Sequence, residues 1–416
     1  ENYRQILNAD GFKELLESEH WDIVPGGKYY VTRNNTSILA FKVGTKLDNY
    51  SFNIVTSHTD SPTFKVKENA EIEVKNKYTQ LNTEGYGGML CATWLDRPLS
   101  IAGRVLVSEG NSIVTKLLNI DRDLLMIPNV AIHMNRAAND GFKYNLQVDM
   151  LPLLSGGDDR QKDFKQIIAD ELGVKKEDIL GHDLYLYNRM APSIWGANEE
   201  FISAGHLDDL QCGFASLKAL LAGYNDESID IMACFDNEEV GSGTKQGADS
   251  TLLRDTLIRI NNALGKTEED YHRALASSFM LSADNAHAVH PNHPEHTDVT
   301  NCTYMNEGVV VKSHAGQKYT SDGVSMAVVK SLASGADVPL QYFANRSDKA
   351  GGSTLGNIAM AQASMNAVDI GLPQLAMHSS YETAGIKDTY YAISLMKALF
   401  DSHIQETSTH SLEIKR

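Results

Sequence analysis

Residues 229–239 read Ile229-Asp230-Ile231-Met232-Ala233-Cys234-Phe235-Asp236-Asn237-Glu238-Glu239, an apolar run followed by two adjacent carboxylates. The short apolar run predicts a buried strand. A carboxylate in such a place is costly to bury, and it takes up a proton unless something compensates its charge. A metal ion bound to Glu239 would provide that compensation, and Glu238 could then act as a general base. The alternative is a solvated acidic turn at a strand end.

Strands and helices alternate around this stretch, which is typical of a sheet covered by helices. We expect strands at 28–33, 37–43, 51–57, 229–235, 277–283, 340–344 and 374–378. We expect helices at 3–18, 208–222, 247–262, 268–276, 321–334, 354–368 and 388–403. The tail, 407–416, is polar and is expected to be frayed.

The segment 86–199 lacks this alternation and contains short strand-like runs separated by polar turns. The fold class predicted is therefore α/β, with a helix-covered, mostly parallel sheet interrupted by an inserted β-rich domain. The predicted boundaries are 1–85 and 200–416 for the α/β domain and 86–199 for the insertion.

Composition narrows the possible partners. The 416 residues carry a formal net charge of −17, which argues against nucleic acid and against anionic membrane surfaces as partners. No uninterrupted apolar stretch is long enough to span a bilayer. The four cysteines are widely spaced without a Cys-x-x-Cys pair, which favours reduced thiols and a cytoplasmic location over a zinc–thiolate site.

Metal-binding residue types follow four of the expected strands. Ligands bind open α/β sheets at the carboxyl ends of their strands, so these side chains are expected to converge. A fifth candidate opens the helix at 208. The candidates are His58, Glu239, Asp284, His378 and Asp208. Each alone has an ordinary explanation as a helix cap, a turn residue or a surface residue.

Two histidines and three carboxylates suit Zn²⁺, with Co²⁺ or Mn²⁺ as substitutes. The set exceeds one tetrahedral zinc with an open position, and it fits two metals that share a bridging carboxylate. Asp60 lies two residues beyond His58, on the same side of the strand, and could fix the tautomer of that ring.

Five motifs carry a resemblance to a known family. They are Thr56-Ser57-His58-Thr59-Asp60, His206-Leu207-Asp208-Asp209-Leu210, Asp236-Asn237-Glu238-Glu239-Val240-Gly241-Ser242, Ser282-Ala283-Asp284-Asn285-Ala286-His287-Ala288-Val289-His290-Pro291-Asn292 and Gln374-Leu375-Ala376-Met377-His378-Ser379. In this order they resemble the aspartyl aminopeptidase and vacuolar aminopeptidase family of metallopeptidases. Tyr86-Gly87-Gly88 and Trp94-Leu95-Asp96-Arg97 resemble that family's entry into its inserted domain.

The resemblance implies a role for each candidate. His58 and Asp284 would hold one zinc, Glu239 and His378 the other, and Asp208 would bridge the two. Glu238 would be the general base for a zinc-activated water, and Asp60 would orient His58. The substrates would be peptides with free N-termini. The inserted domain would mediate dimer contacts within a homo-oligomer, a dodecamer built from dimers.

Three further residues match family positions near the substrate. Lys312 matches a lysine that meets an acidic substrate side chain, His133 matches a histidine that reaches a neighbouring subunit's site, and His287 would line the pocket. An exposed lysine on a strand and a histidine within an inserted-domain strand are the ordinary alternatives. After His378-Ser379 the chain has Ser380-Tyr381-Glu382 where the family has Ile-Arg-Glu. The preference for an N-terminal Asp or Glu over a neutral residue therefore stays open.

A second group of histidines recurs every three residues, at His287, His290, His293 and His296. The spacing suggests a metal site, but Pro291 and Pro294 prevent a regular helix, so the rings need not converge.

Two other functions compete with the aminopeptidase. A related two-metal carboxypeptidase or deacylase would share the ligands but recognise a substrate carboxylate. A non-catalytic, metal-stabilised assembly protein would not require a base such as Glu238 beside a ligand.

Overall fold

The chain forms two compact units in a computed structural model that describes residues 1–157, 163–352 and 354–416. The first unit comprises Glu1–Asp60, Ile194–Met377 and Thr383–Arg416. The second comprises Ser61–Ser193 and His378–Glu382. No helix among the described residues is long and apolar enough to cross a membrane.

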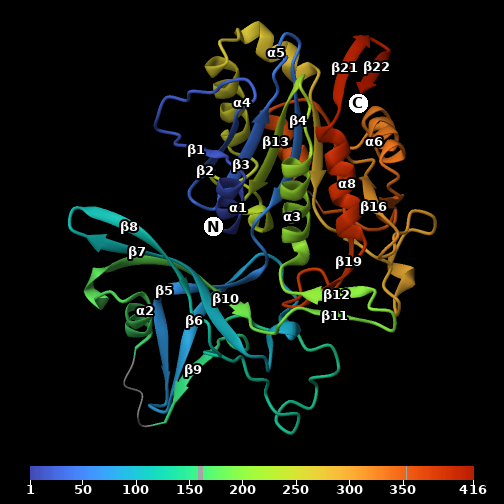
Figure 1. Cartoon of the computed structure of the whole chain (residues 1–416). Coiled ribbons are helices and arrows are strands. Elements are labelled where there is room, and N and C mark those ends of the chain that lie inside the picture. The colour runs from blue at the N-terminus through green and yellow to red at the C-terminus, as the bar shows by residue number, and fades with distance from the viewer. Residues whose placement is uncertain (158–162, 353) are drawn as a thin grey trace. The chain divides into compact units, whose positions relative to one another are not determined.

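A nine-stranded sheet forms the centre of the first unit (Figure 1). Its four central strands, β13, β4, β14 and β18, run parallel to one another, so the sheet is mixed but mostly parallel there. In spatial order the strands are β1 (Lys13–Leu15), β2 (Lys28–Arg33), β3 (Ser37–Val43), β13 (Ser228–Phe235), β4 (Ser51–His58), β14 (Phe279–Ala283), β18 (Asn366–Gly371), β16 (Val309–Ser313) and β17 (Leu340–Ala344).

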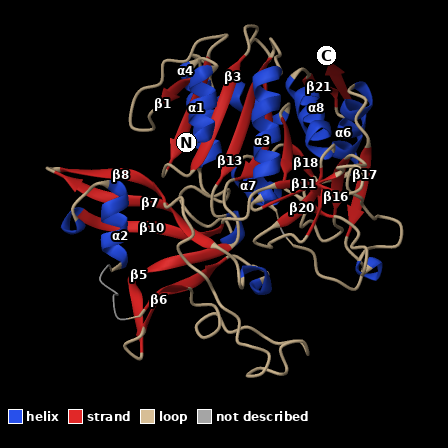
Figure 2. Ribbon diagram, turned by 60° about the horizontal axis from the view of Figure 1, so that its bottom comes forward, coloured by secondary structure: helices blue, strands red, loops and turns tan. Residues whose placement is uncertain are grey.

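Helices cover both faces of this sheet. Val55 of β4 packs into the core under α1, α3, α6 and α8, whereas the adjacent Ile54 packs into the core under α4, α5 and α7. Successive strand residues therefore serve opposite faces, which is why β13 and β4 are buried along their whole length. The helices are α1 (Asn2–Ala9), α3 (Leu207–Ala222), α4 (Leu252–Ala263), α5 (Glu268–Ala276), α6 (Gly323–Gly335), α7 (Leu355–Gln362) and α8 (Asp388–Phe400). Figure 2 shows α1, α3, α6 and α8 along one side of the strands.

Two smaller sheets and short 3₁₀ turns complete the elements around the nine-stranded sheet. A five-stranded sheet runs in the order β11 (Ser193–Trp195), β12 (Phe201–Ala204), β20 (Glu382–Gly385), β19 (Pro373–Leu375) and β15 (Ala286–His287). The chain ends in a hairpin of β21 (His403–Ser408) and β22 (Ser411–Lys415). The first unit contains the 3₁₀ turns η3 (Glu238–Val240) and η4 (Pro294–His296), whereas η1 (Cys91–Trp94) belongs to the second unit.

The second unit is a six-stranded antiparallel sheet with its own core. Phe64 and Trp94 meet edge to face at 5.4 Å in that core, and α2 (Phe164–Leu172) contributes Phe164 and Ile168. The strands, in spatial order, are β8 (Ser112–Asn119), β7 (Leu99–Glu109), β10 (Ile179–Asn188), β5 (Thr63–Val74), β6 (Tyr78–Tyr86) and β9 (Leu153–Gly156). A short 3₁₀ turn, η2 (Lys176–Asp178), precedes β10.

The second unit begins earlier than the insertion expected at 86–199. It starts at Ser61, because β5 and β6 pair with β10 and β9 of the same sheet. Local composition does not reveal which strands pair over long sequence distances. The loss of strand–helix alternation at residue 86 therefore gave a boundary that differs from the start of the second unit. The short segment His378–Glu382 also belongs to this unit, which no local pattern indicated.

Several expected elements differ from those observed. The expected helix at 354–368 ends at Gln362, and the central strand β18 follows it from Asn366. Propensity favoured one continuous helix, but pairing with β14 and β16 makes residues 366–368 the start of a strand. The first helix ends at Ala9 instead of residue 18, and the tail forms the β21–β22 hairpin instead of fraying.

Candidate metal centre

Three neighbouring strands deliver the candidate ligands to one edge of the nine-stranded sheet. β13, β4 and β14 are adjacent and parallel, with Phe235 opposite His58 and Ser282 opposite Thr56. Glu238 and Glu239 therefore follow β13, and Asp284 follows β14, beside the last residue of β4. The expected convergence at carboxyl ends holds for these three strands. The fourth expected strand is β19, which lies in the five-stranded sheet.

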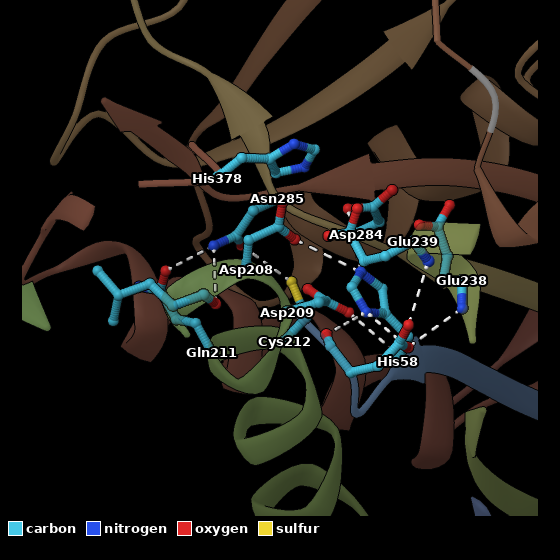
Figure 3. Close-up of polar contacts among 12 residues, drawn as sticks. His58, Asp208, Asp209, Gln211, Cys212, Glu238, Glu239, Asp284, Asn285 and His378 are labelled. Carbon is cyan, nitrogen blue, oxygen red and sulfur yellow. Dashed lines mark hydrogen bonds and ion pairs between the residues drawn. The ribbon is translucent and has the colours of Figure 1, made fainter. Parts of the chain in front are cut away.

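His58 sits at the centre of a group of carboxylates (Figure 3). Its Nε2 lies 3.5 Å from Asp208 Oδ1 and 3.9 Å from Asp284 Oδ1. The donor atoms of these three residues all lie within 4.8 Å of one another, and all three residues are buried. Asp208 and Asp209 have non-helical φ and ψ before the regular part of α3, so Asp208 acts in this cluster and not as an ordinary helix cap.

Asp60 holds the two glutamates by their backbone. The main-chain N–H groups of Glu238 and Glu239 donate to Asp60 Oδ1 at 3.1 Å and Oδ2 at 3.2 Å. From the sequence, the Asp60 carboxylate was expected to accept from the ring of His58. The His58 Nδ1 instead lies 3.0 Å from the main-chain oxygen of Asp60 and 3.5 Å from its carboxylate. A single residue therefore orients the histidine through its carbonyl and the glutamate turn through its carboxylate.

Asp209 and Asn285 support the cluster from behind, and neither residue was assigned a role from the sequence. Asp209 is fully buried, and its Oδ2 accepts the main-chain N–H of His58 at 3.1 Å. The Asn285 amide donates to the main-chain oxygen of Leu207 and to the side chains of Gln211 and Gln374. These bonds tie the start of α3 to β14 and β19. The only indication of Asp209 and Asn285 in the sequence was that they directly follow the candidate ligands Asp208 and Asp284.

Lys312 is a buried partner of the cluster. Its ammonium donates to the main-chain oxygen of Asn285 at 2.8 Å and lies 3.7 Å from Asp284 Oδ2, with the side chain 4% exposed. Burial lowers the pKa of Lys312, but the charge of Asp284 outweighs that effect and raises it overall. Gly371 of β18 packs beside both residues, where a Cβ atom would lie 2.2 Å from the Asp284 main-chain oxygen. The alternative of an exposed strand lysine is wrong, and in this structure the ammonium is turned to Asp284.

His378, His133 and His287 are the remaining predicted residues. His378 belongs to the second unit, where its Nδ1 hydrogen-bonds the main-chain oxygen of Gly88 at 2.7 Å. Its main-chain N–H donates to Glu382. His133 is exposed in a turn of the second unit and not in a strand. His287 is exposed at the end of β15 and lines a pocket of about 270 Å³.

The charges of the cluster are poorly compensated by protein groups alone. Burial, reinforced by neighbouring carboxylates, raises the pKa of Asp284 to about 6, of Glu238 to about 7 and of Glu239 to about 10. Burial alone would lower the pKa of His58, but hydrogen bonds to Asp208 and Asp60 outweigh it and raise that pKa. A divalent cation among these donors would remove the repulsion, and imidazole with carboxylates is a donor set that zinc accepts. The residues therefore fit zinc.

Known proteins resemble this chain over nearly its whole length. The sequence model described as "Aminopeptidase I zinc metalloprotease (M18)" matches residues 1–400. A relative from Clostridium novyi (strain NT), a probable M18 family aminopeptidase 2, is 46% identical over 404 residues, covering 96% of this chain and 93% of its own.

Solved structures show the same fold. The structure of the Ape4 and Nbr1 complex contains a chain with a TM-score of 0.93 and 34% identity, matched over 96% of this chain and 81% of its own. The mApe1 dodecamer of S. cerevisiae gives a TM-score of 0.82 and 28% identity, with coverage of 96% and 91%.

Removal of metal should change how the stability of the protein depends on pH. Asp284, Glu238 and Glu239 have folded pKa values above their unfolded values, so the metal-free folded state binds extra protons. Its unfolding free energy should therefore fall as pH rises from 5 to 8, by about 1.4 kcal/mol per pH unit for each extra proton. Zinc displaces these protons, so the zinc-loaded protein should lose less stability over the same range.

The measurement is the thermal unfolding midpoint at pH 5, 6, 7 and 8, with a chelator and with zinc. Burial also raises the pKa of Asp230 to about 8 and of Asp388 to about 7, outside the cluster. Those two groups act equally in both series, so the difference between the series isolates the metal centre. Parallel curves would contradict the prediction.

Proposed function

The chain belongs to the M18 family of aminopeptidase I zinc metalloproteases, and we propose that two zinc ions per subunit act at the cluster around His58. The enzyme is a zinc-dependent aminopeptidase, a hydrolase of peptide bonds. The observation that carries the proposal is the convergence of three ligand atoms within 4.8 Å: His58 and Asp284 come from the ends of adjacent strands, and Asp208 comes from the start of α3. Family membership favours this function over a carboxypeptidase, a deacylase or a non-catalytic assembly protein.

The proposed ligands divide into two sets that share Asp208. His58 and Asp284 hold one zinc, and Glu239 and His378 hold the other. Support for the first set comes from the 3.5 Å and 3.9 Å separations between His58 Nε2 and the two aspartates. Support for the second comes from the half-buried carboxylate of Glu239, whose pKa is raised to about 10, and from the family resemblance of the motif around His378. Cobalt or manganese would accept the same ligands.

Glu238 is the proposed general base. Zinc ions held there would lower the pKa of a water toward about 7 and polarise the scissile carbonyl. Glu238 accepts the proton of the attacking water and delivers it to the leaving amine. The carboxylate of Asp60 binds the main-chain N–H groups of both glutamates, so the backbone that carries the proposed base and the proposed ligand is held in place. A pKa of Glu238 raised toward neutrality suits a group that must take up and release a proton.

The proposed substrates are peptides with a free N-terminus, and a neutral first residue fits the described residues as well as an acidic one. Lys312, the expected partner of an acidic side chain, donates to Asn285 and lies against Asp284. An acidic preference would require this ammonium to leave both of these partners. His133 lies in the second unit, and a role in a neighbouring subunit's site stays a prediction.

A homo-oligomer, assembled as a dodecamer from dimers, is also proposed. The mApe1 structure with TM-score 0.82 is a dodecamer, and the second unit exposes apolar side chains suited to contact another copy. Ile113 and Leu117 are 68% and 63% exposed on one face of β8, the edge strand of the sheet. We also keep the cytoplasmic location as a prediction, because all four cysteines are free.

Hydrolysis of aminoacyl-p-nitroanilides tests the activity directly. Zinc-loaded protein should release nitroaniline, and a chelator should abolish the release. A panel of first residues, with Asp, Glu, Ala and Leu among them, ranks the specificity. Peptides with a blocked N-terminus and a free carboxylate should not react, because a carboxypeptidase would cleave them and an aminopeptidase would not. Cleavage of those peptides, or no release from any aminoacyl substrate, would contradict the proposal.

Substitution Glu238→Gln should lower kcat by about two to four orders of magnitude, the usual effect of losing a general base. Zinc content should be unchanged, because Glu238 is not among the proposed ligands. Glu269→Gln makes the same chemical change on the exposed surface of α5 and is the matched control. Full activity in the Glu238 variant would remove this residue from the base role.

The double substitution Ile113→Lys and Leu117→Lys should dissociate the assembly, because it places two charges on the apolar face of β8. Sedimentation velocity should show the wild type as a particle near twelve times the 45.8 kDa subunit, and the variant as smaller species. Val299→Lys, at a residue of the first unit that is 92% exposed, is the control and should leave the particle intact. A monomeric wild type would contradict the oligomer.

A further inference from the structure

A group of imidazoles lies on the surface of the first unit, apart from the residues proposed to bind the catalytic zinc ions. The segment 290–296 reads His290-Pro291-Asn292-His293-Pro294-Glu295-His296. The prolines prevent a regular helix, so the rings were not required to converge. In the structure, η4 brings the rings of His293 and His296 into a stack with centroids 5.2 Å apart and planes 19° apart. Pro294 at the start of the 3₁₀ turn fixes the backbone that produces this arrangement.

Glu295 joins the two imidazoles. Its Oε1 lies 3.1 Å from His293 Nδ1 and 3.7 Å from His296 Nε2, and the three donor atoms all fall within 4.8 Å of one another. Ligands bound at 2.0–2.2 Å to a tetrahedral zinc are roughly 3.3 Å apart. The two observed separations bracket that value, so small side-chain rotations would bring the donors to bonding distance. The side chains are 58%, 59% and 71% exposed, and such rotations meet little packing.

Arg346 contacts this turn, but its guanidinium is paired with the carboxylate of another residue. Arg346 makes two hydrogen bonds of 2.9 Å with the carboxylate of Asp348. It donates a further bond to the main-chain oxygen of Glu295, which anchors the turn and leaves the carboxylate to the imidazoles.

We propose that His293, Glu295 and His296 form an additional binding site for a divalent transition metal of the zinc class. Two imidazoles and one carboxylate are borderline donors, which suit Zn²⁺, Ni²⁺ or Cu²⁺ and not Ca²⁺ or Mg²⁺. His290 is not included, because its Nδ1 accepts the main-chain N–H of Asn292 at 3.2 Å.

An ion in this site would change the electrostatics of a pocket. His296 lines the pocket of about 270 Å³ that His287 also lines. Arg346 and Lys349 line the same pocket, so a bound cation would add to a wall that already carries positive charge. The site is independent of the proposed catalytic mechanism, because none of its three residues is assigned to the catalytic zinc ions.

The proposal is tested by titrating the zinc-loaded enzyme with further zinc and measuring the heat by calorimetry. Gel filtration removes loosely bound metal before the titration. The wild type should bind one more Zn²⁺ per subunit than His293→Asn, Glu295→Gln or His296→Asn, or bind it at least about tenfold more tightly. Ca²⁺ should produce no matching heat. An unchanged thermal unfolding midpoint confirms that the variants fold.

His272→Asn is the matched control. His272 lies 3.8 Å from Glu268 on the surface of α5, an exposed histidine and glutamate without a second imidazole. Its titration should equal that of the wild type. Identical titrations for the wild type and the three site variants would overturn the proposal, as would a loss in His272→Asn as large as in those variants.

Discussion

The crowding of acidic side chains around one buried imidazole constrains the rest of this structure. His58 is surrounded by Asp208, Asp284 and the two glutamates of η3, at the edge of a fully buried strand. Burial and mutual repulsion raise the pKa of Glu239 to about 10, so the cluster retains protons unless a cation replaces them. The chain belongs to a family of zinc metalloproteases, and zinc bound here, as proposed, would supply that cation. The ligands are thus an unfavourable arrangement for the bare polypeptide and a favourable one for the metal-bound enzyme.

The surrounding fold holds this unfavourable arrangement in place. β13, β4 and β14 are packed by helices on both faces, so their carboxyl ends cannot shift to relieve the repulsion. Hydrogen bonds then fix the segment after each strand. Asp60 binds the turn of Glu238 and Glu239, Asp209 binds the backbone of His58, and Asn285 ties α3 to β14. Supporting groups of this kind usually matter to metal affinity nearly as much as the ligands do.

Lys312 illustrates how one residue type can take different roles at such a site. A lysine beside a substrate pocket would select acidic side chains, and that role was expected from the family resemblance. In this structure its ammonium lies 3.7 Å from Asp284 and donates to the carbonyl of Asn285. It therefore supplies part of the positive charge that the buried carboxylates require. The distinction depends on the direction of one side chain, which no motif specifies.

Local patterns in the sequence predicted the metal chemistry of the site. A metal-binding site at one edge of a helix-covered sheet could be predicted from the acidic run 236–239 after an apolar strand, together with His58 and Asp284 after two others. This was possible because strand ends and residue types are local properties of the sequence. Tertiary structure decided the features that depend on distant pairing and on packing. It made 366–371 a central strand, it drew β5 and β6 into the second unit, and it turned the carboxylate of Asp60 toward the glutamate turn. It also brought His293 and His296 together despite two prolines. Sequence periodicity records which residues are buried, whereas the partner that each buried or polar group meets is fixed only when remote segments pack.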